Sequence, residues 1–144
     1  MHESFEINSS AGAYQVIIGS GLLADILREH PCALVLVDSY LADAIGVPPE
    51  RVLPIVATEQ AKSLERMPEV IIGLRQMGAN RSSELLAIGG GVVQDVATFV
   101  ASVYMRGLPW IYMPTTLLGM TDSCIGGKSS INVSGYKNLV GNFY

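Results

Sequence analysis

Short apolar runs, rich in valine, leucine and isoleucine, recur along this chain. They occupy residues 32–37, 51–56, 85–88 and 110–113. The run 32–37 is continuous rather than alternating, which is the pattern of a buried parallel strand, and the other three runs are also expected to be strands. Two earlier segments, at 5–8 and 14–18, are expected to pair as an antiparallel hairpin added to that sheet.

Residues with helical spacing fill most of the intervals between these runs. Helices are expected at residues 22–28, 41–45, 62–77 and 92–105. Ser20 is expected to cap the first of them, and Pro68 to bend or delay the third. The fourth is almost wholly apolar, so it should be buried on most faces. The alternation of strands and helices predicts one α/β domain over residues 1–144, Rossmann-like and doubly wound, with a mostly parallel sheet.

A triple glycine, 89–91, joins a predicted strand to the apolar helix. A tight turn would explain one or two glycines. Three in a row favour the close approach of a phosphate, because the first amides of a helix point at such a ligand. The spacing is not that of the common dinucleotide fingerprint. Asp95 follows one helical turn later. A carboxylate is costly to bury alone, so Asp95 is expected to face the site and bind amides or a ligand hydroxyl.

A second polar stretch follows the last predicted strand. It contains hydroxyls, a carboxylate, amides and ammonium groups, on Thr115, Thr116, Asp122, Lys128, Asn132, Lys137 and Asn138. A solvated loop with helix caps would use similar residues. Apolar residues are interleaved with these polar ones throughout, however, so the stretch must pack. This favours a site for a phosphorylated nucleotide, a polyhydroxylated substrate, or both.

The other polar residues of interest each have two interpretations. Asp38 ends a buried strand, where its carboxylate could accept from ribose hydroxyls or cap the segment that follows. Glu59 and Lys62 are three residues apart, and this spacing alone favours a solvated ion pair or a capping interaction. Arg106 adds a cation that an ordinary helix end would also present to solvent.

Composition narrows the classes of protein. Apolar residues make up 49% of the chain and charged residues 15%, so part of the surface is expected to be buried against a second domain or subunit. The net charge of −4 argues against a nucleic-acid partner, and no apolar run is long enough for a membrane helix. Cys32 and Cys124 are expected to be reduced thiols of a cytoplasmic protein. The apolar run 139–144 suggests a fragment of a longer protein.

Taken together, the motifs resemble those of the 3-dehydroquinate synthase family, which are NAD- and metal-dependent sugar phosphate cyclases. The matching elements are Asp38, Glu59-x-x-Lys62, Gly89-Gly90-Gly91-Val92-Val93-x-Asp95, Tyr104-x-Arg106-Gly107, Pro114-Thr115-Thr116, Asp122-Ser123-x-x-Gly126-Gly127-Lys128, Asn132 and Lys137-Asn138. The order and spacing of these elements make the resemblance specific, and it is densest from Leu86 onward.

The resemblance implies a role for each of these residues. The adenosine end of NAD would be held by Asp38, Glu59 and Lys62. The pyrophosphate and nicotinamide ribose would be surrounded by Gly90, Gly91, Val92, Asp95, Thr115 and Thr116. The catalytic residues between nicotinamide and substrate would be Asp122, Lys128, Lys137 and Asn138. Arg106 would reach the substrate phosphate of a neighbouring subunit, which implies a homodimer.

The resemblance also implies the reaction. A seven-carbon keto sugar acid phosphate becomes 3-dehydroquinate and phosphate through transient oxidation by NAD, phosphate elimination, re-reduction and aldol closure. The family's metal ligands, a Glu and two His that bind zinc or cobalt, belong to a C-terminal helical domain. The histidines of this chain are His2 and His30, far from the motifs. We therefore expect no metal site in this chain, and no activity from it alone.

Three other functions stay open. Gln94 stands where the family mostly has glycine, and Tyr136 where glycine usually precedes Lys-Asn, which leaves room for another sugar phosphate cyclase with a different substrate. Metal-dependent alcohol and glycerol-phosphate dehydrogenases share the expected fold. A non-catalytic nucleotide-binding module would need no metal ligands. The segment Gly126-Gly127-Lys128 and the pair Lys137-Asn138 favour the cyclase over the dehydrogenases.

Overall fold

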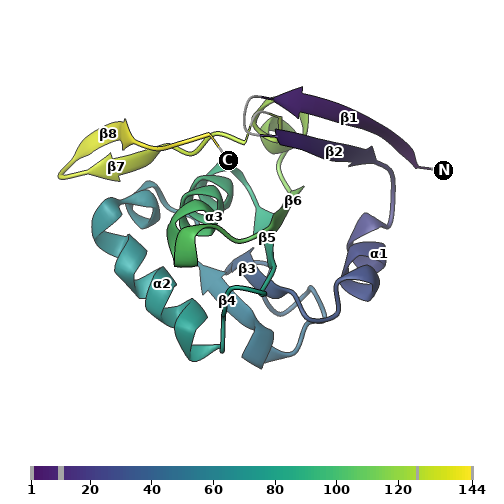
Figure 1. Cartoon of the computed structure of the whole chain (residues 1–144), viewed down its shortest axis with the longest axis horizontal. Helices are drawn as coiled ribbons and strands as arrows, with labels where there is room; N and C mark the ends of the chain where they lie inside the picture. The colour runs from purple at the N-terminus through teal and green to yellow at the C-terminus, as the bar shows by residue number, and fades with distance from the viewer. Residues whose placement is uncertain (1, 10–11, 126, 144) are drawn as a thin grey trace. The chain divides into compact units, whose positions relative to one another are not determined.

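The computed structural model of this chain describes residues 2–9, 12–125 and 127–143, which divide between two compact units. The first unit, 1–31, contains strands β1 (Glu3–Ser9) and β2 (Gly12–Ile18) and helix α1 (Leu22–Glu29). The two strands are antiparallel, with Glu3 opposite Ile18 (Figure 1). This confirms the predicted hairpin and the predicted first helix. The hairpin was predicted to extend the parallel sheet, but it forms a two-stranded sheet of its own.

The N-cap predicted for α1 is wrong. Gly21 occupies that position with φ 75, and no described side chain caps the helix. A left-handed backbone is strained for a residue with a Cβ, so the turn into α1 selects glycine at this position. Ser20 contributes its carbonyl oxygen instead, which lies 3.1 Å from Nε2 of His2.

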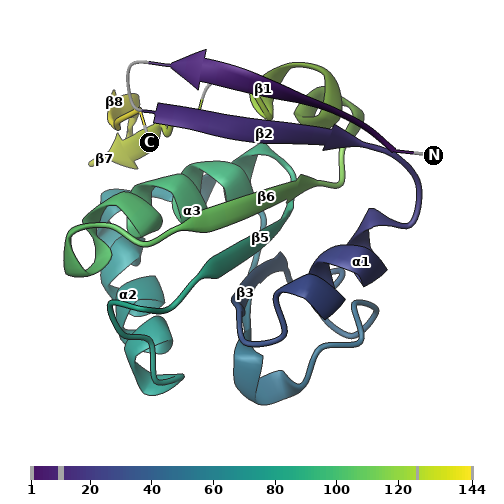
Figure 2. The ribbon, with the colours of Figure 1, turned by 45° about the vertical axis from the view of Figure 1, so that its right-hand side comes forward.

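The second unit, 32–144, is built on a four-stranded parallel sheet. Its strands are β3 (Leu34–Asp38), β4 (Val52–Ile55), β5 (Leu85–Gly89) and β6 (Trp110–Pro114), in the order β4-β3-β5-β6. Figure 2 shows β5 and β6 side by side along α3. Strand β3 is buried except at Asp38, as its continuous apolar pattern predicted, and β5 is buried throughout.

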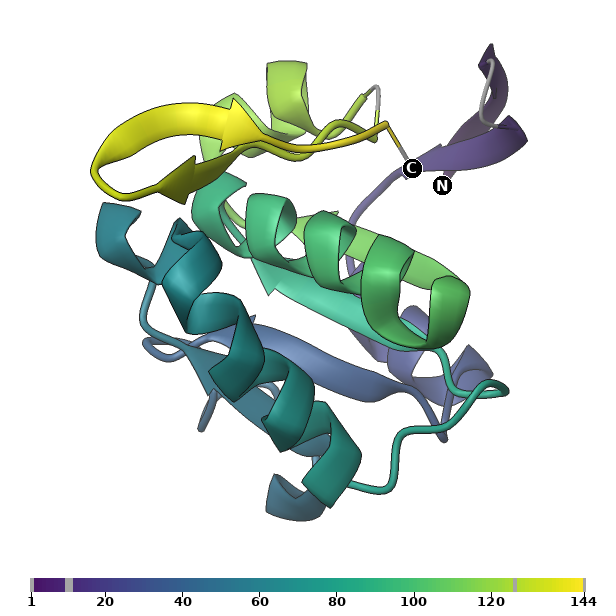
Figure 3. The same ribbon diagram turned by 60° about the vertical axis from the view of Figure 1, so that its left-hand side comes forward.

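Two α-helices lie on one face of this sheet, α2 (Met67–Gln76) and α3 (Gly91–Val103) (Figure 3). The sequence predicted both. Pro68 stands in the first turn of α2 and delays its start, and the residues before it form the short 3-10 helices η2 (Glu59–Lys62) and η3 (Leu64–Arg66). Further 3-10 helices are η1 (Pro49–Arg51) and η4 (Tyr104–Arg106).

The helix predicted at 41–45 is wrong, because the structure has consecutive turns there. Leu41 N donates to Asp38 O at 2.8 Å, and Ala44 N to Leu41 O at 2.9 Å. Gly46 follows in the left-handed region, at φ 67. The segment is too short for a helix to propagate before the glycine and the prolines that follow end it.

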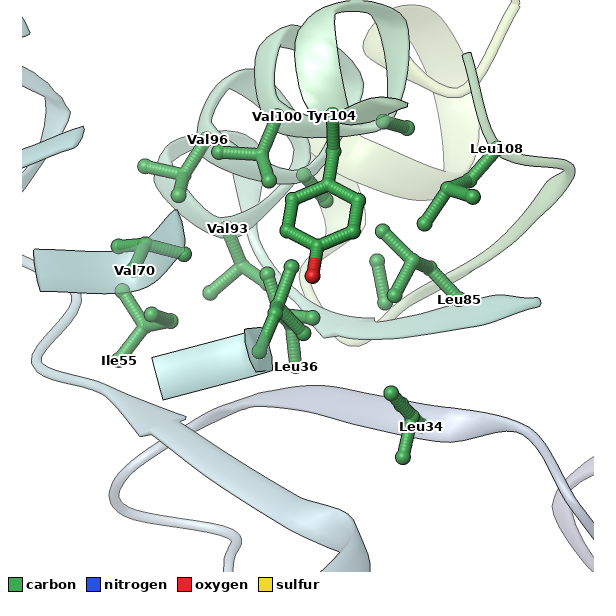
Figure 4. Packing of buried hydrophobic residues seen from close by; sticks show 14 of the residues in the cluster. Leu34, Leu36, Ile55, Val70, Leu85, Val93, Val96, Val100, Tyr104 and Leu108 are labelled. Atoms are coloured by element: carbon green, nitrogen blue, oxygen red, sulfur yellow. The ribbon is translucent and has the colours of Figure 1, made fainter. Parts of the chain in front are cut away.

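The core lies between the sheet and these two helices. Figure 4 shows its side chains converging, among them Leu36 from β3, Leu85 from β5 and Val96 from α3. Tyr104 is almost fully buried at the end of α3, and its hydroxyl donates to the carbonyl oxygen of Ala79 at 3.1 Å. The phenol is therefore satisfied inside an apolar core.

Beyond β6 the chain forms only short elements. The segment Gly119–Ser123 forms one turn of π-helix, η5, and strands β7 (Ile131–Val133) and β8 (Tyr136–Val140) form an antiparallel hairpin. This hairpin was not predicted, because its strands are only 3 and 5 residues long and mix polar with apolar residues. Within the described ranges, no helix is both long and apolar enough to cross a membrane.

Candidate functional site

The strand order places a change of direction at the carboxyl ends of β3 and β5. The chain passes from β3 to β4 on one side and then returns to β5 on the other side of β3. Val37 pairs with Ile88, so Asp38 and Gly89 are neighbours at the same edge of the sheet. Ligands of open α/β sheets bind at such a switch point. The triple glycine lies there.

The glycine turn is shaped by close contacts on one side and open space on the other. A Cβ on Gly90 would lie 2.9 Å from Cγ2 of Thr116, whereas one on Gly91 would have no described heavy atom within 4 Å. Gly89 O accepts from Thr115 N at 3.0 Å and from the Tyr112 hydroxyl at 3.1 Å. The turn is thereby fixed against the end of β6, with Gly91 facing open space.

The beginning of α3 is suited to an anion. No described side chain caps it, and its first turn carries no acidic residue. Its first amides therefore keep their hydrogen-bonding capacity and the partial positive charge of a helix N-terminus. Burial raises the pKa of nearby Tyr112 to about 12, so its phenol stays protonated and neutral at this edge.

Lys62 is the centre of a polar network beside this turn. Its Nζ donates to Asp95 Oδ2 at 2.9 Å and to Asn138 Oδ1 at 3.1 Å, and the residue is only 9% exposed. The other carboxylate oxygen of Asp95 accepts from Ser130 N at 2.9 Å. The expectation that Asp95 binds an amide is confirmed. The sequence predicted a solvated ion pair between Lys62 and Glu59, and this prediction is wrong. Lys62 is buried, and its contact with Glu59, at 3.8 Å, is longer than its contact with Asp95.

Asn132 connects the same network to η2. Its Nδ2 donates to Glu59 Oε1 at 2.9 Å and lies 3.3 Å from Glu59 O, while its Oδ1 accepts from Asn138 N at 2.8 Å. The hydrogen bond from Asn132 holds the pKa of the Glu59 carboxyl below its usual 4.5, and the charges of Lys62 and Lys137 act in the same direction. Figure 3 shows the β7–β8 hairpin lying against one end of α3.

The π-helical turn η5 carries Asp122, which is exposed. The side-chain amide of Gln94, buried on α3, donates to the carbonyl oxygen of Ser123 and so joins the two helices. The Ser123 hydroxyl is buried and has no hydrogen-bond partner among the described residues. Single π-helical turns inside helices are frequent at functional sites. Gln94 therefore holds the turn that presents Asp122.

The structure brings most, but not all, of the predicted residues together. Asp38 forms a local turn, with Oδ1 accepting from Tyr40 N at 3.1 Å. Lys128 and Lys137 are exposed near the network, and Gly126 lies outside the described residues. Arg106 stands at the opposite end of α3, a helix of 13 residues and so about 20 Å long. The length of α3 therefore separates Arg106 from the glycine turn.

Metal ligands are not gathered in this site. Among the described residues, no three of His, Cys, Asp and Glu form a group that could hold a metal ion. Cys32 is exposed and Cys124 half-buried, both as free thiols. The residues present do not fit the metal that the resemblance implies. The glycine turn and the beginning of α3 do fit a pyrophosphate, because they offer open space and helix amides that no described side chain caps.

Two site residues were assigned no role from the sequence alone. Asn132 was only part of a motif, and Ser130, whose amide binds Asp95, carried no signal. Their partners lie 73 and 35 residues away, so spacing along the chain could not identify them. A buried asparagine inside a three-residue strand is a signal only once the strand is known.

The parallel sheet, its switch point and the glycine turn place this chain in the Rossmann-like class of α/β domains. Residues 52–144 match the family model described as 3-dehydroquinate synthase N-terminal. A 3-dehydroquinate synthase from Pyrobaculum neutrophilum is 41% identical over 97% of this chain. The chain belongs to the 3-dehydroquinate synthase family.

Solved structures of sugar phosphate cyclases have the same fold as this chain. A 2-deoxy-scyllo-inosose synthase complexed with carbaglucose-6-phosphate, NAD+ and Co2+ matches 99% of this chain at 26% identity and a TM-score of 0.83. A 2-epi-5-epi-valiolone synthase from Streptomyces hygroscopicus, with NAD+ and Zn2+ bound, matches 88% at 30% identity and a TM-score of 0.74. The chain spans 43% and 39% of those two proteins, and 40% of the Pyrobaculum relative.

The network around Lys62 predicts a large loss of stability when the cation is removed. Lys62→Met should lower the free energy of unfolding by about 3 kcal/mol, because the Asp95 carboxylate is left buried without its charge partner. Urea unfolding followed by the fluorescence of Trp110, the single tryptophan, measures this. The matched control is Lys128→Met at an exposed position, which should change stability by less than about 0.5 kcal/mol. Equal losses in the two variants would contradict the assignment.

The Glu59 carboxyl should titrate below 4.5, as followed by NMR of its carboxyl carbon. Since the folded pKa lies below the unfolded one, the carboxylate stabilises the fold above about pH 4.5, and this contribution is lost as pH falls through the folded pKa. Asn132→Ala should move the Glu59 pKa upward. Asn142→Ala removes an amide that binds Ser129 instead, and should leave the Glu59 pKa low. An unchanged pKa in Asn132→Ala would show that the hydrogen bond from Asn132 is not the cause of the shift.

Proposed function

We propose that this chain is the NAD-binding part of a 3-dehydroquinate synthase. The whole protein, a carbon–oxygen lyase, would convert a seven-carbon keto sugar acid phosphate to 3-dehydroquinate and phosphate. The observation that carries the proposal is the glycine turn at the switch point, with open space at Gly91 and a network of lysines and amides beside it. The membership of the family supports the choice of reaction.

The turn would hold the pyrophosphate of NAD through the first amides of α3, with Thr115 and Thr116 on the facing strand end. Asp38 and Glu59 present carboxylate oxygens suited to ribose hydroxyls. Bound NAD supplies a hydride acceptor that is restored within each turnover. Gly90 and Val92 would line the approach to the turn, and Asp95 would hold Lys62 in place.

The other wall of the site would face the substrate. Asp122, exposed on η5, offers a carboxylate that can orient a hydroxyl and take its proton. Lys128 and Lys137 are exposed cations that would stabilise negative charge as it develops on the substrate. Asn138 is held by hydrogen bonds at both its backbone N–H and its side-chain Oδ1, so its amide is already oriented before a substrate arrives.

Arg106 would serve the site of a second subunit. It lies about 20 Å from the glycine turn along α3, and so cannot reach the turn of its own chain. Met105 and Arg106 have positive φ values of 48 and 77, a strained backbone of the kind that clusters at functional sites. A homodimer in which Arg106 binds the substrate phosphate of the partner accounts for both observations.

The residues that bind the metal would lie outside this chain. The inosose and valiolone synthases contain Co2+ and Zn2+ respectively, whereas the described residues of this chain offer no cluster of metal ligands. We therefore assign the metal site to the part of the relatives that this chain does not span. The isolated chain is expected to lack cyclase activity, and the whole enzyme to work in the cytoplasm.

The open space at Gly91 yields a direct test of NAD binding. Gly91→Ala should weaken the affinity of the full-length protein for NAD by about 10-fold or more, because the new methyl group enters the phosphate space. Stability should be unchanged or rise by up to about 1 kcal/mol, since alanine suits a helix better than glycine. Calorimetric titration and urea unfolding provide the two measurements. Ser102→Ala, near the other end of α3, is the control that should bind NAD normally.

A turnover assay separates the cyclase from its rivals. The full-length protein, with NAD and zinc or cobalt, should release phosphate from the keto sugar acid phosphate without accumulating NADH. Net NADH formation would indicate a dehydrogenase, and NAD binding without turnover would indicate a nucleotide-binding module. Phosphate release from a sugar phosphate lacking the carboxylate, but not from the acid, would indicate another cyclase. Turnover by the 144-residue chain alone would contradict the assignment of the metal site.

A further inference from the structure

The β7–β8 hairpin contains a large irregularity. Ile131 pairs with Val140, but Val133 pairs with Tyr136, so one residue of β7 faces three residues of β8. Those three include Lys137 and Asn138, which the proposed function places at the substrate. Asn138 has φ 52, in the left-handed region. Bulges of this kind leave residues unpaired and redirect their side chains, and they are common beside active sites.

Asn132 is the single residue of β7 that faces this bulge. The residue is only 8% exposed, and its side-chain hydrogen bonds are directed at two partners. The Oδ1 atom accepts from the bulged Asn138 N at 2.8 Å, in place of a ladder bond. The Nδ2 atom donates to Glu59 Oε1 at 2.9 Å. The Asn132 side chain therefore joins the bulge to η2, a segment more than 70 residues earlier in the sequence.

We propose that Asn132 is a positioning residue that sets the backbone at Asn138 and the carboxylate of Glu59 together. This inference rests on the proposed function, which places Glu59 on the ribose side and Asn138 on the substrate side. A single buried amide would then couple the two sides of the site. When the bulge is held in this form, the Asn138 side chain reaches Lys62, and Lys62 reaches Asp95.

The chemistry of the two contacts explains why an amide stands at position 132. Asn138 presents a backbone donor and Glu59 a carboxylate acceptor, so the side chain between them must accept on one side and donate on the other. A carboxylate at this position could still accept from Asn138 N, but would repel Glu59. An apolar side chain of the same size would remove the hydrogen bonds to both the Asn138 N–H and the Glu59 carboxylate.

Two substitutions separate the two contacts. Asn132→Ala removes both. Asn132→Asp keeps the acceptor for Asn138 N and loses the donor to Glu59. In this chain, hydrogen exchange of the Asn138 backbone amide should become about 10-fold faster in Asn132→Ala and change less than about threefold in Asn132→Asp. Asn80→Ala, in the loop before β5, is the matched control and should leave this exchange rate unchanged.

Kinetics of the full-length protein provide the second measurement. Asn132→Asp should raise KM for NAD by about 10-fold with kcat nearly unchanged, because only Glu59 is displaced. Asn132→Ala should also lower kcat, by about 10-fold or more, because Asn138 moves as well. Loss of folded protein would lower the apparent kcat of both variants without a change in KM, so the split in Asn132→Asp is not expected from a purely structural residue.

A double variant tests the contact between residues 132 and 59 without relying on Asn132→Ala. Asn132→Asp combined with Glu59→Gln can form the same bond in the reverse direction, and should recover the stability lost in Asn132→Asp. The proposal is overturned if Asn132→Ala leaves the Asn138 exchange rate within about twofold of the wild type. It is also overturned if both single variants lower kcat and raise KM for NAD by the same factors. A full-length wild type that needs no NAD would refute the proposed function, while the exchange rates would still decide whether Asn132 holds Asn138.

Discussion

The burial of one ammonium group constrains the whole site. Lys62 is 9% exposed, and a cation removed from water to this degree needs partners with matching charge and geometry. It obtains them from α3 through Asp95 and from β8 through Asn138. These partners are 33 and 76 residues away in the sequence. The positions of η2, α3 and the β7–β8 hairpin therefore cannot change independently without exposing or isolating the charge.

The sheet and the polar network fix different parts of the site. The sheet fixes the glycine turn, because Gly89 is paired with β6 and buried in β5. The polar network then fixes the irregular segments around the turn. Asp95 has both carboxylate oxygens committed, one to Lys62 and one to Ser130 N. Its charge is thus balanced within the network, and the positive end of α3 remains available to an anion.

The sequence predicts the regular elements well, and the irregular ones poorly. Continuous apolar runs located the four parallel strands, and the cost of burying Asp95 correctly predicted a bonded carboxylate. The helix expected at 41–45 was wrong, because a short amphipathic run does not outweigh the glycine and prolines that follow it. Local spacing predicted an ion pair between Lys62 and Glu59. Propensity and spacing cannot identify a partner as distant in the sequence as Asp95. The strands of the hairpin, 3 and 5 residues long, were too short to be recognised from their pattern.

These misses have a common physical origin. Several candidate residues lie on a 3-10 turn, a π-helical turn and a bulged hairpin, conformations for which residue propensity carries little information. Side-chain hydrogen bonds hold such segments, so their shape depends on the donors and acceptors of a few buried residues. Gln94 and Asn132 are two of these, and each joins segments from different parts of the chain. Gln94 binds the turn that carries Asp122. A change at a position that touches no substrate can therefore alter how the site presents a residue that does.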